Sequence, residues 1–155
     1  MQSTKQAIFR LGQDEYSLDI MDVIAIEKIL TIEPVSSFTQ NFKGVISLRG
    51  DIIPVYSLRR KFGLEDTQPD ADTRFVIASV NEMQVAFEVD KMAEIVQVNP
   101  DQMNEVPVIL KDKDTSYLKL ISKVGDHLVI MLDKNGILTE EEHKKMVAGV
   151  KKIKE

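Results

Sequence analysis

Valine and isoleucine dominate the apolar part of this sequence, and they constrain its fold more than any other feature. The chain contains 16 Val and 16 Ile among its 155 residues, against only seven Ala. Branching at Cβ restricts side-chain rotamers and favours pleated, half-buried strands over helices. Short runs of these residues recur between turn-forming residues along most of the chain, a pattern typical of small barrels. We therefore expect a mainly β protein.

Turn residues divide the chain into hairpins. The expected strands are 7–11, 16–20, 23–32, 44–50 and 51–56 in the first part, and 74–80, 83–89, 94–98, 106–110, 117–124 and 127–132 in the second. A short helix over 58–62 follows Ser57, a residue type that caps helices well. About five short strands per half favours two small barrels packed together, because a barrel closes its own edges.

The acidic, breaker-rich stretch 64–73 separates the two parts. We expect a single domain over 1–155, with a first barrel half over 6–66, a second over 67–138 and a C-terminal helix over 139–155. The N-terminal strand is compatible with pairing in either half. Thr139 and Glu142 form a capping box for the helix, whose apolar face, Met146, Val147, Val150 and Ile153, packs either on the protein's own barrel or on another chain.

Charge and composition narrow the classes of function. Lys and Arg total 20 against 25 Asp and Glu, a formal net charge of −5 at pH 7, and an acidic chain repels nucleic-acid phosphates. The absence of cysteine excludes disulfides and thiolate metal sites. Charges interrupt every apolar run before the roughly 20 residues needed to cross a bilayer. We expect a cytoplasmic protein with no nucleic-acid partner and no direct membrane insertion.

The sequence offers little for catalysis. It contains neither a glycine-rich phosphate loop nor a Gly-x-Ser-x-Gly segment. Its two histidines, His127 and His143, have no second ligand at metal spacing. Asp90 ends an apolar strand and is expected to accept backbone hydrogen bonds as a structural cap. We therefore expect no catalytic residue, no metal and no cofactor.

Arg49 stands at the mouth of the second hairpin, between Leu48 and Gly50. Its guanidinium can reach a carboxylate bidentately. Two interpretations remain open: an internal ion pair that braces the hairpin, and a contact with a partner.

Two segments carry a family resemblance. Residues 16–20, YSLDI, and 44–63, GVISLRGDIIPVYSLRRKFG, resemble the CheW family of chemotaxis coupling proteins, and the likeness continues through 85–90 and the 117–132 hairpin. It covers roughly residues 6–138. The resemblance implies two five-stranded SH3-like barrels around a shared hydrophobic core, and no catalysis.

The same resemblance implies a scaffold function and its sites. Such proteins are adaptors that couple the cytoplasmic tips of methyl-accepting chemoreceptors to the regulatory domain of the histidine kinase CheA, in membrane-associated arrays where further CheW copies join rings. Receptor-binding positions here would be Val23, Gly44, Leu48 and Arg49, around the groove between the barrels. Kinase-binding positions would be Ala86 and Ile95. The receptor tip is a helical hairpin, so we expect a helix-in-groove mode of docking.

Three residues depart from the family pattern. Ala25 stands where glutamate is frequent, Ser57 where aspartate is frequent and Leu120 where glycine is frequent. The change at Ala25 removes a polar receptor contact, whereas Ser57 still caps a helix.

Two alternative functions remain. One is a related scaffold of a chemosensory pathway that does not control motility. The other is a small-ligand-binding β-barrel, which would need a pocket with convergent polar groups. The start at Met1 and the capped tail helix favour a free-standing protein over a kinase's own regulatory domain.

Overall fold

The computed structural model describes residues 2–36, 40–107 and 117–154, and these form two β-sheets with short helices. Sheet 1 has the strand order β8 (Lys91–Val98), β1 (Thr4–Leu11), β2 (Asp14–Asp19), β11 (His127–Leu132), β10 (Leu118–Val124) and β9 (Met103–Asn104). Sheet 2 has the order β3 (Val23–Lys28), β6 (Arg74–Val80), β7 (Met83–Val89), β5 (Asp51–Ser57) and β4 (Phe42–Leu48). The helices are α1 (Leu58–Lys61), α2 (Lys134–Ile137) and α3 (Glu140–Lys154), with 3-10 turns over Ile20–Asp22 and Pro100–Gln102.

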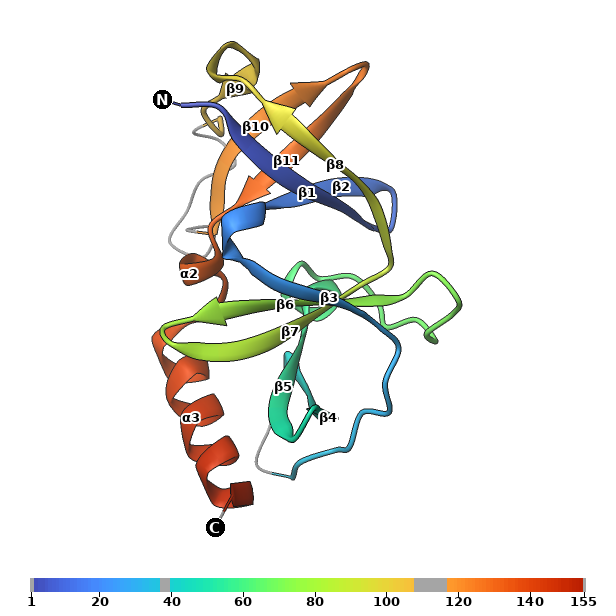
Figure 1. The fold of residues 1–155 in the computed structure, drawn as a ribbon, viewed down its shortest axis with the longest axis vertical. Helices are drawn as coiled ribbons and strands as arrows, with labels where there is room; N and C mark the ends of the chain where they lie inside the picture. Colours follow the sequence, from blue (N-terminus) through green and yellow to red (C-terminus); the bar gives the residue numbers. More distant parts are fainter. Residues whose placement is uncertain (1, 37–39, 108–116, 155) are drawn as a thin grey trace.

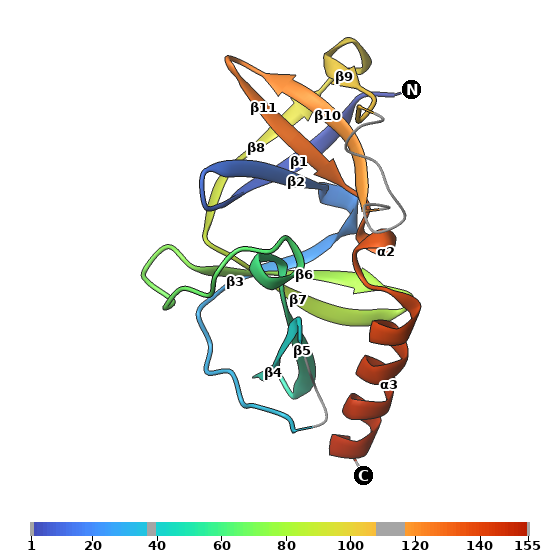
Figure 2. The same ribbon diagram turned by 180° about the vertical axis from the view of Figure 1, so that it is seen from behind.

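The two sheets are stacked along the long axis of the molecule, with α3 beside sheet 2 (Figures 1 and 2). The mainly β, SH3-like expectation is confirmed, although neither sheet is a fully closed barrel. Sheet 2 has five strands, the expected number, and sheet 1 has six, because it includes the two-residue β9. Sheet 2 curls toward closure where Glu33 and Val45 exchange backbone hydrogen bonds of 2.8 and 2.9 Å, which join the segment after β3 to the opposite edge strand β4.

The sheets do not follow the expected halves, 6–66 and 67–138. The first two strands pair with β8 and β11, so they belong with the C-terminal strands, while β6 and β7 lie in the sheet of β3, β4 and β5. Two parallel pairings hold this arrangement together: β2 with β11, and β5 with β7. Parallel neighbours require a crossover between them, so strands far apart in sequence become neighbours in space.

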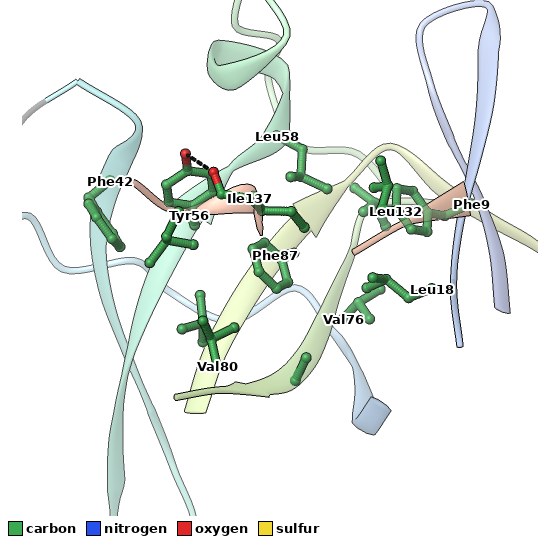
Figure 3. Close-up of a cluster of buried hydrophobic side chains, with 14 of the residues drawn as sticks. Phe9, Leu18, Phe42, Tyr56, Leu58, Val76, Val80, Phe87, Leu132 and Ile137 are labelled. Atoms are coloured by element: carbon green, nitrogen blue, oxygen red, sulfur yellow. Dashed lines mark hydrogen bonds between the residues drawn. The ribbon is translucent and has the colours of Figure 1, made fainter. Parts of the chain in front are cut away.

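The largest hydrophobic cluster lies between the sheets, and we call it the shared core. Figure 3 shows it, with Phe9, Leu18 and Leu132 from sheet 1 facing Val76, Phe87 and Tyr56 from sheet 2. A second cluster fills the interior of sheet 2 with Ile46, Ile53, Val55, Phe75, Ile77 and Ala86. Because sheet 2 buries both of its faces, β6 and β7 are nearly continuous apolar runs rather than alternating ones.

Local turn chemistry closes the hairpins. Asn81 and Glu82 both have positive φ, as do Arg49 and Gly50, and this is the backbone geometry of a two-residue turn between twisted strands. The second hairpin turns at Arg49-Gly50, because Leu48 pairs directly with Asp51, so the expected strand 44–50 ends two residues early.

Most of the expected strand 106–110 lies outside the described residues, and its first two residues are not in a strand. The strand in this region is β9, where Asn104 pairs with Ile121.

Helix α3 docks on the protein's own fold through a capped first turn. Thr139 Oγ1 accepts from Glu142 N, and a Glu142 carboxylate oxygen accepts from Thr139 N, both at 3.0 Å, so the capping box is confirmed. Glu142 also accepts hydrogen bonds from Tyr56 Oη at 3.0 Å and Asn41 Nδ2 at 2.9 Å. Met146 and Val150 of the expected apolar face are buried and Ile153 packs partly against the shared core, whereas Val147 is 39% exposed.

Asp90 links three parts of the chain. Its carboxylate accepts from Gly12 N at 2.8 Å and from Arg59 of α1 at 2.8 and 2.6 Å. The expectation that Asp90 caps backbone donors is therefore confirmed. Burial alone would raise the pKa of the Asp90 carboxyl, but the hydrogen bonds from Arg59 and Gly12 hold that pKa below its usual range.

Candidate partner-binding surface

A row of exposed apolar side chains follows the 3-10 turn and β3. We call it the β3 row; its members, with their exposed fractions, are Met21 (87%), Ile24 (54%), Ile26 (37%) and Ile29 (41%). The alternate residues of β3, Val23 and Ala25, are partly buried against the core clusters. Strand geometry sends successive side chains to opposite faces, so one face of β3 completes the core and the other presents the row.

The position of β3 makes this row accessible. β3 is the terminal strand of sheet 2 and pairs only with β6 among the described strands. Figure 1 places the Ile20–Asp22 turn and the start of β3 at the junction between the two sheets. Exposed apolar side chains along an edge strand are an aggregation hazard unless a partner covers them.

Two of the expected receptor-binding residues lie close to β3. Leu48 is partly buried against the sheet 2 interior, the cluster that Ala25 of β3 also packs against. Arg49 is 74% exposed, and its Nη2 lies 3.3 Å from Glu27 Oε1 on β3. The internal ion pair considered for Arg49 is therefore present, and the guanidinium is still open to solvent.

The other two expected receptor-binding residues differ in exposure. Val23 opens β3 and packs partly against the shared core. Gly44 is buried, with φ +145, and a Cβ built on it would lie 2.2 Å from the Glu33 carbonyl oxygen. Its lack of a side chain permits the close approach of two backbones. Gly44 thus shapes the β4 edge and offers no side chain or exposed surface to a partner.

The two expected kinase-binding residues are not equivalent. Ala86 is 0% exposed, because β7 lies between β6 and β5 and Ala86 belongs to the sheet 2 interior. Its assignment to a kinase-binding surface is therefore corrected. Ile95 is exposed on β8, a terminal strand of sheet 1, where it pairs with Ala7. Ile95 remains available for a partner.

The sequence reasoning missed the β3 row as a surface. The sequence predicts a strand over 23–32 but no exposed apolar surface on it. The signal was present: 23–26 is apolar at four consecutive positions, so a strand with one buried face must expose two of them. What the sequence could not show is that β3 ends a sheet.

The three departures from the family pattern occupy structural positions. Ala25 is partly buried against the sheet 2 interior, and Leu120 packs partly against Val98, Met103 and Met131 inside sheet 1. Ser57 Oγ accepts from Arg60 N at 3.2 Å and caps α1, as expected.

The described residues contain little that resembles an active site. They include no group of three or more His, Cys, Asp or Glu side chains placed to hold a metal ion. Over the same residues, no helix has the length and apolar character needed to span a membrane. The most prominent surface feature is the apolar β3 row.

Comparisons with known proteins agree with this structure. The model of the CheW-like domain family matches residues 6–142. The chain is 30% identical over 133 residues to the chemotaxis protein CheW of Helicobacter pylori, covering 86% of this chain and 80% of that protein. It is 28% identical to the chemotaxis protein CheW of Bacillus subtilis, covering 92% of each.

A solved structure shares the fold. The scaffolding protein TtCheW from Thermoanaerobacter tengcongensis superposes with a TM-score of 0.82 at 26% identity, covering 92% of this chain and 96% of that one. The family model spans both sheets and ends at the first turn of α3. This chain belongs to the CheW-like family.

Proposed function

We propose that this protein is a non-catalytic adaptor that couples the cytoplasmic tips of chemoreceptors to the regulatory domain of the histidine kinase CheA. Its relatives are chemotaxis proteins and a scaffolding protein, and this supports the role of a scaffold in chemotaxis. The adaptor works in the cytoplasm and is recruited to membrane-associated receptor arrays, where further copies of the family join rings.

The β3 row is the observation that carries this proposal. Ile24 and Ile26 lie on the edge strand β3, Met21 precedes it in the 3-10 turn and Ile29 follows it, and burying one such side chain stabilises a complex by roughly 1.5–3 kcal/mol. A helical receptor tip can lay an apolar stripe along such a row. Arg49 and Glu27 beside it supply charge that fixes the orientation of the docked helix.

The kinase docks elsewhere in this proposal. Ile95 lies on β8, a strand of sheet 1, whereas the β3 row belongs mainly to sheet 2. An adaptor needs two surfaces that can be occupied together, and two terminal strands from different sheets provide them. Ile95→Asp should weaken kinase binding and leave receptor binding unchanged.

The first test compares two matched charge insertions. Ile24→Asp places a carboxylate in the β3 row, and Leu128→Asp places one at an equally exposed apolar residue on β11 of sheet 1. Calorimetric titration with a receptor-tip fragment should show at least about tenfold weaker binding for Ile24→Asp and wild-type binding for Leu128→Asp. Equal weakening by both, or by neither, would remove the β3 row from receptor binding.

The second test separates the two roles of Arg49. Arg49→Glu reverses a charge and also breaks the ion pair with Glu27. The exchange Arg49→Glu with Glu27→Arg restores the pair with its charges swapped. If the receptor contacts Arg49 directly, the exchange variant still binds weakly; recovery of wild-type affinity would show that Arg49 only braces the turn.

A further inference from the structure

Met21, the first residue of the β3 row, is the most exposed methionine among the described residues, at 87%. It lies in the 3-10 turn Ile20–Asp22, just before β3. The other described methionines are buried or pack partly against the shared core: Met83, Met92, Met103, Met131 and Met146. Among these residues, the Met21 sulfur is the one that an oxidant in solution reaches most readily.

The composition makes methionine the side chain of interest for oxidation. The sequence contains no cysteine and no tryptophan, so no thiol of this chain competes for a peroxide. Hydrogen peroxide transfers one oxygen atom to the thioether sulfur, which loses two electrons and becomes a sulfoxide, while the peroxide is reduced to water. Methionine sulfoxide reductases reverse the step; the sulfoxide oxygen leaves as water and two thiols are oxidised to a disulfide.

The backbone around Met21 is held in place on both sides. Asp19 Oδ1 accepts from Met21 N at 2.9 Å, and Lys134 Nζ of α2 lies 3.7 Å from Asp22 Oδ1. The turn itself sits at the junction of the two sheets (Figure 1). A chemical change at the exposed sulfur therefore alters the β3 row without requiring the turn to unfold.

We propose that Met21 is a reversible oxidation site, at which a peroxide converts the thioether to the sulfoxide and lowers the affinity of the β3 row for the receptor tip. This inference rests on the proposed function, because it requires the receptor to dock on the row. A sulfoxide is polar, whereas the thioether is apolar. Burying that polar oxygen against an apolar stripe without a hydrogen-bond donor is unfavourable.

The first test follows the chemistry alone. The full-length protein is treated with hydrogen peroxide, and the sulfoxides are located by mass spectrometry of its peptides. The sulfoxide should form at least about tenfold faster at Met21 than at Met83 or Met92, because susceptibility follows exposure. The urea midpoint of the oxidised protein should not change, since the Met21 side chain contributes little to the core. Equal rates at the three residues would overturn the proposal.

The second test measures receptor binding. The protein is oxidised, freed of peroxide and titrated calorimetrically with a receptor-tip fragment. Oxidised wild type should bind about tenfold more weakly than the reduced protein, and reductase treatment should restore its affinity. Met21→Leu keeps the size and apolar character but cannot form a sulfoxide, so it should bind like the reduced wild type before and after peroxide.

Met92→Leu is the matched control, because it removes a different methionine and retains Met21. Its affinity should fall on oxidation as that of the wild type does. Unchanged affinity of the oxidised wild type, or an equal loss in Met21→Leu, would overturn the proposal.

Ile24→Asp separates this inference from the proposed function. If Ile24→Asp weakens receptor binding and oxidation of Met21 does not, the oxidation site is wrong and docking on the β3 row stands. If Ile24→Asp leaves receptor binding unchanged, the β3 row is not the receptor site, and the effect proposed for Met21 is wrong with it.

Discussion

Asp90 and Asp66 each form an ion pair with an arginine, but the two pairs differ in burial and in the segments that they join. We therefore expect them to contribute differently to stability. Arg59 and Asp90 have side-chain exposures of 16% and 27%, whereas Arg60 and Asp66 have 35% and 48%. Asp90 also accepts from Gly12 N, which lies 78 positions away in sequence, while Asp66 is only six residues from Arg60. The first pair ties sheet 1 to α1, and the second pair stays local.

Replacing Asp90 by Asn should destabilise the protein strongly. The change leaves the Arg59 guanidinium partly buried without its carboxylate, and breaking a buried pair costs about 3–5 kcal/mol. The pair is not fully buried, so we expect about 2–4 kcal/mol for Asp90→Asn. Asp66→Asn breaks an exposed pair and should cost about 0–1 kcal/mol.

Acid provides an independent check on the same residue. Because the pKa of Asp90 is lowered in the folded protein, its stabilising effect is present above the unfolded pKa of about 3.9 and is lost as pH falls through the folded pKa. The difference between wild type and Asp90→Asn should therefore shrink in acid. Urea unfolding at neutral pH and at about pH 3 measures both effects, with the m-value as a check on two-state behaviour. Equal costs for the two variants at neutral pH would refute the reasoning.

Three further predictions concern alkaline pH, a close backbone approach and the α3 cap. Burial raises the pKa of Tyr16 to about 12, and burial together with the adjacent Glu142 carboxylate raises the pKa of Tyr56. Above about pH 10, each of these two tyrosines should therefore lower the free energy of unfolding by about 1.4 kcal/mol per pH unit. Tyr56→Phe should halve this slope in urea melts. Gly44→Ala, which would place a Cβ 2.2 Å from a carbonyl oxygen, should lower the free energy of unfolding by more than about 3 kcal/mol in thermal melts. Gly50→Ala, with nothing within 4 Å, should cost about 1 kcal/mol, and similar costs for the two would contradict the steric argument. Thr139→Ala should cost about 1 kcal/mol and speed amide exchange in the first turns of α3, and unchanged exchange there would contradict the cap.

Two of the hairpin turns and the helix caps could be predicted because their causes are local. Asn81-Glu82 and Gly125-Asp126 turn where expected, and Ser57 and Thr139 cap the helices that follow them. In each case the residues that decide the conformation are within four positions of one another. A conformation that is decided over so short a range can be predicted from a single sequence.

The assignment of strands to sheets could not be predicted in the same way. The pairing of Val129 with Glu15 and of Val55 with Ala86 joins distant strands in parallel. An alternating pattern shows that a strand has a buried face but carries no information about its neighbour. The misplacement of Ala86 has a related cause, since residues 85–87 are buried on both faces of β7 and such a run does not reveal an exposed end.

The topology also explains why the proposed receptor-binding surface lies on β3. Sheet 2 buries one face in its interior and the other in the shared core, so apolar residues on its central strands all contribute to folding. At β3, the inward residues Val23 and Ala25 complete those clusters, while Ile24 and Ile26 face solvent. Folding therefore has no need of an apolar residue at Ile24 or Ile26, and solubility favours a polar one. The proposed receptor, by covering this face, would give them a physical reason to be apolar, and on that proposal Ile24→Asp should leave the free energy of unfolding within about 0.5 kcal/mol of the wild type while weakening receptor binding.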